Sequence, residues 1–248
     1  MVASLAIKQR PSDSCHKYVI VSTRGTFERP GSSIGFRGMI KKTLATVPGG
    51  IERDVHYLAA PDMTQITTLI GSRDIQTLIK KGLETCPSQT YALLGYSQGA
   101  TVVLEALRKF RGTSTEKAIK AVLFIGNPYQ VPNQASTVDE DGGNSTRASQ
   151  GVLLPLIRPI GLTDEWVKSG KALNICYRKD LVCNGLAFDT LNMKHLYYGF
   201  SDRVQKQGSD FLISKLADST PHKEGDHKGK GERHAESESG RGTDYGNY

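Results

Sequence analysis

Apolar residues along the chain fall into two kinds of pattern, which alternate from residue 18 to residue 216. Short unbroken apolar runs predict buried strands, at 18–23, 55–59, 91–94, 121–126 and 172–177. Between them, apolar residues recur at helical spacing and predict helices over 34–47, 62–86 and 98–111, with a closing helix that ends at 216. Helices that alternate with fully apolar strands are typical of an α/β fold, in which helices cover both faces of a parallel sheet.

Two segments depart from this alternation. Residues 129–170 form one long connection, which begins polar, becomes apolar in GVLLPLIRPIGL and ends in TDEWVKSGK. Connections of this length are usually functional or disordered, and we expect an insertion that can lie over the functional site as a flap. Residues 217–248 contain no Leu, Ile, Val, Phe, Met or Trp. They cannot offset the entropy of ordering, which predicts a disordered polar tail after a single domain over 1–216.

Charge and hydropathy indicate whether the chain binds nucleic acid or crosses a membrane. The 248 residues carry a formal net charge of +7, but no basic cluster with interleaved aromatic residues is present, so we expect no nucleic-acid binding. No stretch reaches the roughly 18 apolar residues that a membrane-spanning helix needs, and we expect no integral membrane segment. We expect the protein to be a monomer.

The segment LLGYSQGATVVLEALRKF, residues 93–110, places Ser97 between Gly95 and Gly99. A Gly-x-Ser-x-Gly string is informative only where a strand precedes it and a helix follows it, and both are predicted here. Glycines at these two positions relieve side-chain clashes in a sharp strand-to-helix turn. The pattern predicts that Ser97 is a nucleophile exposed at the end of a strand.

A serine hydroxyl needs a base that removes its proton, and the chain has six histidines. Three of them lie in the predicted tail, and His16 precedes the first strand. His56 lies within the second predicted strand, where a histidine is usually a packed core residue. His195 follows the last strand and comes after Ser97 in chain order, as in hydrolase triads. His195 is therefore the predicted base.

The third member of such a triad is a carboxylate between the serine and the histidine in sequence. Asp180 follows the strand at 172–177 and lies in CYRKDLVC, where a bridge between the flanking cysteines would close a short loop around it. Catalytic groups gather at the carboxyl ends of parallel strands, so we predict Asp180 as the acid. The alternatives are Asp189 and five carboxylates of the insertion, Asp139, Glu140, Asp141, Asp164 and Glu165.

The four cysteines, at positions 15, 86, 176 and 183, include no C-x-x-C pair and no zinc-finger spacing. We therefore expect no metal site. An even count with one close pair indicates two disulfides, for which three connectivities exist. Disulfides indicate an oxidising compartment. The first ten residues do not form a full signal peptide, yet the cysteines lead us to expect a secreted, extracellular protein.

Four blocks of the chain, in order, resemble motifs of the cutinase family of small secreted serine esterases. The second block, CPSQTYALLGYSQGA, has Cys-Pro before a strand and Tyr-Ser-Gln-Gly at the turn. The third block, CYRKDLVCNG, has an Asp-x-Val-Cys core between two cysteines. The blocks are RGTFERPG, CPSQTYALLGYSQGA, CYRKDLVCNG and HLYY. The matching pieces are spread over residues 15–216, and the chain resembles a divergent member with an insertion before the acid block.

The resemblance implies an α/β-hydrolase fold with a central, mainly parallel sheet of five strands and helices on both faces. It implies a triad of Ser97, Asp180 and His195, with an oxyanion hole formed by the backbone N–H groups of Thr26 and Gln98. It implies no metal or organic cofactor. The implied disulfides are Cys15–Cys86 and Cys176–Cys183.

The implied activity is hydrolysis of carboxylic esters through an acyl-enzyme, with cutin-like polyesters or short- and medium-chain lipid esters as substrates. Leu186, Phe188 and Leu191 are candidates for an apolar wall beside the acyl group, although ordinary loop packing explains them equally well. Two other functions stay open: an acetyl esterase acting on xylan or another plant polysaccharide, and a hydrolase-fold protein that binds without turnover. Because the base must be neutral, we expect activity to fall below about pH 6–7.

Overall fold

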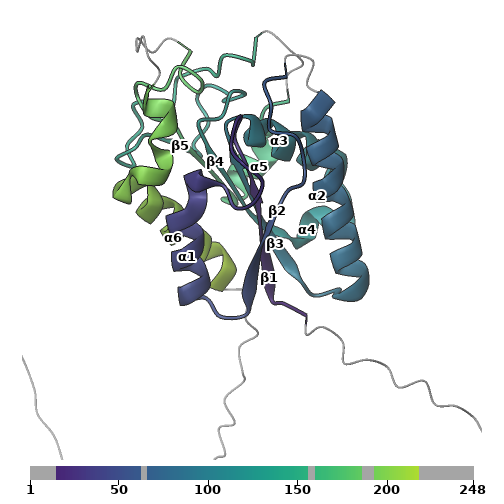
Figure 1. Ribbon diagram of the computed structural model, residues 1–248. Coiled ribbons are helices and arrows are strands. Elements are labelled where there is room, and N and C mark those ends of the chain that lie inside the picture. Colours follow the sequence, from purple (N-terminus) through teal and green to yellow (C-terminus); the bar gives the residue numbers. More distant parts are fainter. Residues whose placement is uncertain (1–14, 63–65, 156–159, 186–192, 218–248) are drawn as a thin grey trace, which may run out of the picture.

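The structure, a computed structural model, describes residues 15–62, 66–155, 160–185 and 193–217. The strands in these ranges are β1 (Tyr18–Thr23), β2 (Gly50–Asp54), β3 (Thr90–Tyr96), β4 (Ile119–Ile125), β5 (Thr137–Val138) and β6 (Ala172–Ile175). They form one sheet in the order β2-β1-β3-β4-β6-β5 (Figure 1), and every neighbouring pair is parallel. The predicted α/β class with a parallel sheet is confirmed.

Helices cover both faces of this sheet (Figure 1). The α-helices are α1 (Arg37–Thr46), α2 (Ile66–Thr85), α3 (Gln98–Phe110), α4 (Ser114–Ala118), α5 (Asp164–Lys168) and α6 (Asp202–Leu216). Short 3-10 helices are η1 (Ile34–Phe36), η2 (Met193–Leu196) and η3 (Tyr198–Phe200). α1 packs beside α6 on one face, and α2 beside α3 on the other.

The core consists of two apolar layers, one on each face of the sheet. Because side chains alternate along a strand, β1 places Val19 and Val21 in the layer under α2 and α3. The same strand places Tyr18 and Ile20 in the layer under α1 and α6. Burial on both faces explains why most of the strands are unbroken apolar runs in the sequence.

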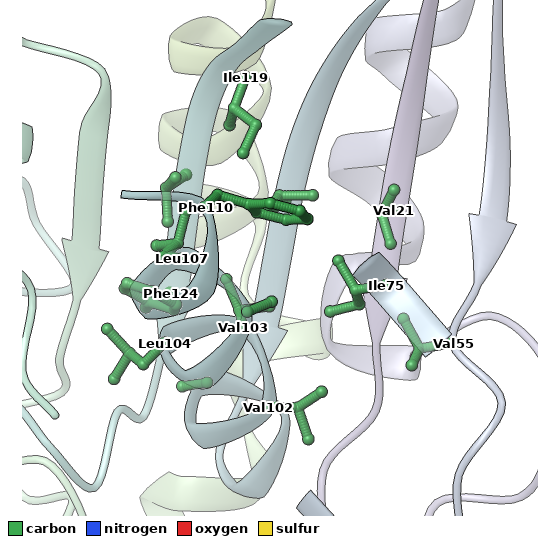
Figure 2. Packing of buried hydrophobic residues seen from close by; sticks show 14 of the residues in the cluster. Val21, Val55, Ile75, Val102, Val103, Leu104, Leu107, Phe110, Ile119 and Phe124 are labelled. Atoms are coloured by element: carbon green, nitrogen blue, oxygen red, sulfur yellow. The ribbon is translucent and has the colours of Figure 1, made fainter. Parts of the chain in front are cut away.

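α3 is buried along most of its length. Its residues Val102, Leu107 and Phe110 lie in one cluster with Val21 of β1 and Ile75 of α2 (Figure 2). Burying such a side chain stabilises the fold by about 1.5–3 kcal/mol. The helix is therefore held firmly against the sheet, and its first turn is fixed at the end of β3.

The second strand lies earlier than the apolar pattern predicts. The run at 55–59 predicts a strand, whereas β2 spans Gly50–Asp54. β2 is an edge strand and only partly buried, so its sequence need not be apolar. Residues 55–59 form an irregular segment in which Val55 and Tyr57 are buried. The His56 side chain is 82% exposed, so the interpretation of His56 as a core residue is wrong.

The sheet has one strand more than the five that the resemblance implied. β5 lies within the 129–170 insertion and pairs with β6 at the sheet edge. A strand of two residues leaves no periodic pattern in the sequence. The predicted count was therefore short by this strand.

The insertion is packed onto the domain over the described part of its length. Ile160, Leu162 and Trp166 lie in the same apolar cluster as α3. The Gln130 side chain lies between the insertion and the sheet, where its amide donates to the carbonyl oxygens of residues 146 and 149 and its oxygen accepts from the Asn174 amide. These contacts give the segment a fixed path across the carboxyl ends of the strands.

Apart from residue 217, the predicted polar tail lies outside the described residues. Among the helices of the described ranges, none is long and apolar enough to cross a membrane.

The disulfide Cys15–Cys86 joins the start of β1 to the end of α2, with its two Cα atoms 5.7 Å apart. It lies at the amino ends of the strands. The pairing is the one that the family resemblance implied.

Removing this disulfide is expected to lower the stability of the fold without changing the structure at the carboxyl ends of the strands. The bridge spans 71 positions, and closing a loop of that length contributes about 4 kcal/mol by restricting the unfolded chain. Urea unfolding of a C15S/C86S variant, compared with the oxidised wild type, measures the loss. A change in the free energy of unfolding below about 1 kcal/mol would contradict this expectation.

Candidate active site

Ser97 occupies the turn between β3 and α3. Its backbone angles are φ 53° and ψ −119°, which a non-glycine residue adopts only where the surrounding structure holds it there. A Cβ at Gly95 would lie 2.6 Å from the Ala100 Cα, and one at Gly99 would lie 2.3 Å from the Thr23 carbonyl oxygen. The two glycines therefore allow β1, β3 and α3 to approach closely enough for this turn to form.

His195 lies against Ser97, although 98 positions separate them in the sequence. The distance from His195 Nε2 to Ser97 Oγ is 2.8 Å. The Tyr96 hydroxyl donates to the His195 carbonyl oxygen over 2.6 Å, which ties η2 to the end of β3. The ring is thus held within hydrogen-bond range of a hydroxyl proton that it can accept.

Asp180 contacts the other nitrogen of the His195 ring. His195 Nδ1 lies 3.0 Å from Asp180 Oδ1 and 2.9 Å from Oδ2. The carboxylate is fully buried, and it accepts hydrogen bonds from the Val182 backbone N–H at 2.8 Å and the Tyr198 hydroxyl at 2.6 Å. These donors suit an ionised carboxylate, which in turn keeps the imidazole proton on Nδ1.

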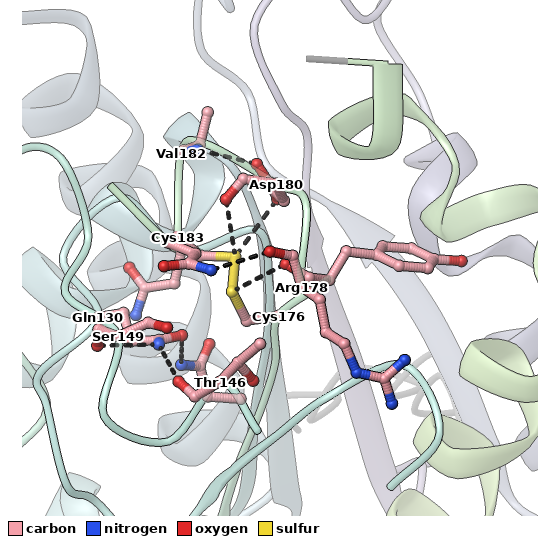
Figure 3. Close-up of a disulfide and its surroundings, with 12 residues drawn as sticks. Gln130, Thr146, Ser149, Cys176, Arg178, Asp180, Val182 and Cys183 are labelled. Atoms are coloured by element: carbon pink, nitrogen blue, oxygen red, sulfur yellow. Dashed lines mark hydrogen bonds between the residues drawn. A yellow bond between two sulfur atoms is a disulfide. The ribbon is translucent and has the colours of Figure 1, made fainter. Parts of the chain in front are cut away.

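Residues 176–183, which we call the acid loop, carry Asp180. The disulfide Cys176–Cys183 closes this loop, with its Cα atoms 5.9 Å apart (Figure 3). Cys183 Sγ lies 3.4 Å from Asp180 Oδ2. The covalent bridge therefore sits directly behind the carboxylate and limits its movement.

Arg178 joins the acid loop to the insertion. Its guanidinium lies 2.8 Å from Asp141, 3.3 Å from Glu140 and 3.4 Å from Asp139. Burial opposes ionisation of Asp139, but hydrogen bonds from Ser145 and neighbouring backbone N–H groups lower its pKa to about 2. The three insertion carboxylates that were alternatives for the triad acid thus pair with an arginine rather than with the histidine.

The remaining alternatives also lie away from the histidine or outside the described residues. Asp164 and Glu165 belong to α5, where Glu165 interacts with Arg111 beyond the end of α3. Asp189 falls in 186–192, outside the described residues. In the described ranges, the carboxylate hydrogen-bonded to His195 is that of Asp180.

Gly126 follows β4 and lies beneath the histidine and the acid. Its φ is +58°, in the left-handed region that favours glycine. A Cβ at this position would lie 2.7 Å from His195 Cε1 and 3.0 Å from Asp180 Oδ2. Both the backbone conformation and the available space therefore require glycine here.

Thr26 and Gln98 line the same cavity as Ser97. Gln98 is the first residue of α3, so its backbone N–H has no acceptor within the helix and lies at the positive end of the helix dipole. Thr26 lies in the loop after β1, directly before Phe27, whose φ is 67°. An arrangement of this kind can stabilise a negatively charged oxygen beside Ser97.

The loop that carries Thr26 is organised around Glu28. The Glu28 carboxylate accepts hydrogen bonds from the Gly25 N–H at 2.6 Å and the Ile34 N–H at 2.7 Å. The Ser33 hydroxyl donates to it over 2.9 Å. One carboxylate thus closes both ends of the loop and fixes the backbone next to Ser97.

A cavity of about 320 Å³ opens beside Ser97, and its surface is mainly apolar. It is lined by Thr26, Phe27, Pro61, Asp62, Ser97, Gln98, Thr101, Pro128, Val152, Leu153 and Val182. The insertion supplies Val152 and Leu153 to this wall. The predicted wall residues Leu186, Phe188 and Leu191 lie outside the described residues.

Several residues that shape the site are absent from the sequence prediction. Tyr96 and Tyr198 lie within GYSQG and HLYY, the motifs that contain Ser97 and His195, but the sequence analysis assigns no role to either tyrosine. Val152 lies in an apolar run with no distinguishing pattern, and Gly126 ends a strand like many other glycines. Across the described ranges, no group of three or more His, Cys, Asp or Glu side chains is placed to hold a metal ion.

Comparisons with known proteins agree on one family. The family model described as Cutinase matches residues 14–216. Carboxylesterase Culp1 of Mycobacterium tuberculosis (strain ATCC 25618 / H37Rv) is 27% identical over 208 residues, which cover 83% of this chain and 84% of that protein. The cutinase of Monilinia fructicola is 27% identical over 154 residues, covering 57% of this chain and 75% of its own.

Solved structures show the same fold. A cutinase-like protein from Cryptococcus sp. superposes with a TM-score of 0.74 and 32% identity, covering 84% of this chain and 98% of its own. The catalytic core domain of acetyl xylan esterase from Trichoderma reesei has a TM-score of 0.64 and 21% identity, covering 81% of this chain and 99% of its own. At 21% identity, the similarity to the acetyl xylan esterase shows only that the two proteins share a fold.

Replacing Gly126 by alanine is expected to displace His195 and Asp180. We expect a G126A variant to hydrolyse p-nitrophenyl butyrate at least about 100-fold more slowly, because displacements near 1 Å have effects of that size. Steady-state kinetics and urea unfolding of the purified variant test this.

Gly112 offers the matched control. Its φ is +73°, yet an added Cβ meets nothing within 4 Å. A G112A variant therefore introduces the same kind of backbone strain, about 1 kcal/mol, and should keep its activity. Equal activities for G126A and G112A would contradict the assignment of Gly126.

Proposed function

The chain belongs to the cutinase family and is a carboxylic ester hydrolase of the serine esterase type, and we propose that Ser97, His195 and Asp180 form its catalytic triad. The observation that carries this proposal is the series of contacts from Ser97 Oγ to His195 Nε2 at 2.8 Å, and from His195 Nδ1 to the Asp180 carboxylate at 2.9 Å. The order of the three residues along the chain is that of α/β-hydrolases.

In this proposal His195 acts first as a base and then as an acid. Ionised Asp180 accepts a hydrogen bond from the Nδ1–H group, which keeps that proton on Nδ1. The Nε2 lone pair therefore faces Ser97 and takes the hydroxyl proton as Oγ attacks the ester carbonyl carbon. The protonated imidazole then gives its proton to the leaving alcohol, and the acyl group stays on Ser97. Water, activated by His195 in the same way, releases the acid and restores the serine.

The oxyanion that forms during attack needs donors that are already in place. We assign the backbone N–H groups of Gln98 and Thr26 to this role. Each such donor contributes about 3–4 kcal/mol to transition-state stabilisation. The position of Gln98 at the start of α3 and the bonds of Glu28 around the Thr26 loop support this assignment.

The surroundings of Ser97 favour aliphatic esters. The cavity beside the serine is mainly apolar, and Phe27 at its wall is 81% exposed. Leu196, which follows the base in the sequence, is 58% exposed. An apolar cavity with an exposed aromatic side chain at its wall suits a lipid-like or polyester substrate, whose chains lose contact with water on binding. We therefore propose short- and medium-chain aliphatic esters as the substrate class.

We also propose that the protein is secreted. The two disulfides, one of them directly behind the triad acid, support an oxidising compartment for its folding.

A series of p-nitrophenyl esters from C2 to C16 tests the substrate class. We expect kcat/KM to be highest between C4 and C12, because those acyl chains bury apolar surface in the cavity. Activity confined to C2 would instead support an acetyl esterase acting on polysaccharide.

The same series run on a Ser97→Ala variant tests the triad. We expect its rate to fall by about 10⁴–10⁶-fold at every chain length, as happens when a triad nucleophile is removed. Turnover by this variant at the wild-type rate would contradict the role of Ser97.

Filling the cavity should change chain-length preference. Val152 lines the cavity wall and is partly exposed, so a V152W variant reduces the space available to an acyl chain. We expect the ratio of C8 to C2 activity to fall about 10-fold, in the range of pocket effects on specificity. The C2 rate of the same variant is the internal control, and an unchanged ratio would contradict the assignment of the cavity to the acyl chain.

A further inference from the structure

Tyr198 places its hydroxyl against the triad acid in the protein interior. The residue is fully buried, and its hydroxyl oxygen lies 2.6 Å from Asp180 Oδ2. The Tyr177 backbone N–H donates to the same hydroxyl oxygen over 3.1 Å. The Tyr198 ring packs edge-on to the His195 ring, with 6.3 Å between centroids. Tyr198 thus touches both partners of the Asp180–His195 contact.

These contacts fix the direction of the Tyr198 proton. The Tyr177 N–H can only donate, so it occupies a lone pair of the hydroxyl oxygen. An ionised carboxylate can only accept, so the hydroxyl proton points at Asp180 Oδ2. Burial and the neighbouring Asp180 charge raise the pKa of Tyr198 well above its ordinary value. The hydroxyl therefore keeps its proton throughout the working pH range of an esterase.

The donor is not easily replaced by solvent. Asp180 and Tyr198 are both fully buried, and Oδ1 already has its own backbone donor in Val182. Oδ2 depends on the Tyr198 hydroxyl and the His195 ring. Hydrogen bonds to an ionised acceptor are roughly twice as strong as those between neutral groups. The Tyr198 hydroxyl is thus a main electrostatic neighbour of the carboxylate.

We propose that Tyr198 is a positioning residue of the esterase reaction: its hydroxyl holds the Asp180 carboxylate toward His195 and offsets part of its negative charge. The offset limits how strongly Asp180 stabilises the positive charge that the imidazole gains when it takes the serine proton. The inference rests on the triad proposed above and adds a fourth side chain, one that acts through the acid.

Other titratable groups lie on the elements around the pair. They are Lys194 on η2, Tyr177 on the acid loop, Glu28 in the loop after β1, Tyr96 on β3 and Arg203 at the start of α6. Replacing Tyr198 by phenylalanine leaves the charge of each of these groups as it was. A change in the pH profile of that variant therefore reports the lost hydroxyl.

The test is a Tyr198→Phe variant assayed with p-nitrophenyl butyrate from pH 5 to 9. We expect kcat to fall about 10-fold and KM to change less than about 2-fold, since the lost bond orients the acid rather than the substrate. We expect the acidic limb of kcat/KM to move up by about 0.5–1 pH unit, because the less compensated carboxylate favours protonated His195.

Tyr18→Phe is the matched control. Tyr18 is also fully buried and lies in the same core layer. Its hydroxyl donates over 2.6 Å to the Val47 carbonyl oxygen, at the amino ends of the strands and away from the triad. Both variants lose one buried hydroxyl that donates a hydrogen bond, so both should be less stable than the wild type in urea unfolding. Only Tyr198→Phe should shift the acidic limb. A limb that stays in place or moves to lower pH in Tyr198→Phe would overturn the proposal.

If Tyr198→Phe does not fold, a second variant tests the same role of the hydroxyl. Site-specific replacement of Tyr198 by a ring-fluorinated tyrosine preserves the hydroxyl and makes it a stronger donor. The acidic limb should then move to lower pH, and an unchanged limb would overturn the proposal. The Ser97→Ala variant separates the two proposals. Full activity in that variant would contradict the triad itself. An inactive Ser97→Ala variant, together with an acidic limb that does not move in the Tyr198 variants, would contradict only the role of Tyr198.

Discussion

The hydrogen bond between the Ser97 hydroxyl and the His195 ring is the contact on which the rest of the site depends. It joins the end of β3 to η2, two segments that come together because parallel strands all end at the same edge of the sheet. The strained turn at Ser97 aims the hydroxyl, and Tyr96 holds the histidine backbone. Gly126 leaves the space into which the histidine ring fits.

Hydrogen bonds and ion pairs join the insertion to the acid loop and to residues 184–185, which follow it. The Val152 N–H donates to the Val182 carbonyl oxygen over 3.1 Å, and the Gly185 N–H donates to the Gln150 carbonyl oxygen over 2.9 Å. Arg178 adds ion pairs between the same two segments. The wall of the proposed acyl cavity and the loop that carries the triad acid are therefore held together. A displacement of one is expected to displace the other.

The sequence predicts the parts of this protein that local pattern determines. Strands buried on both faces, such as β1 and β4, appear as apolar runs, and the glycines around Ser97 mark its turn. β2 was placed too late because an edge strand with a solvated face needs no apolar run, and β5 is too short to leave a pattern. The positions of Val152 and Tyr198 depend on long-range packing, which a single sequence does not encode in any local period.

The proposed roles of Ser97, the oxyanion donors and the cavity are tested together by a crystal structure of the protein after reaction with a p-nitrophenyl alkylphosphonate, which mimics the tetrahedral intermediate. We expect one phosphonate bonded to Ser97 Oγ, with an oxygen within hydrogen-bond distance of the Gln98 and Thr26 N–H groups and the alkyl chain in the cavity beside Val152. An adduct on a different residue, or an unmodified Ser97 in inhibited protein, would contradict these roles.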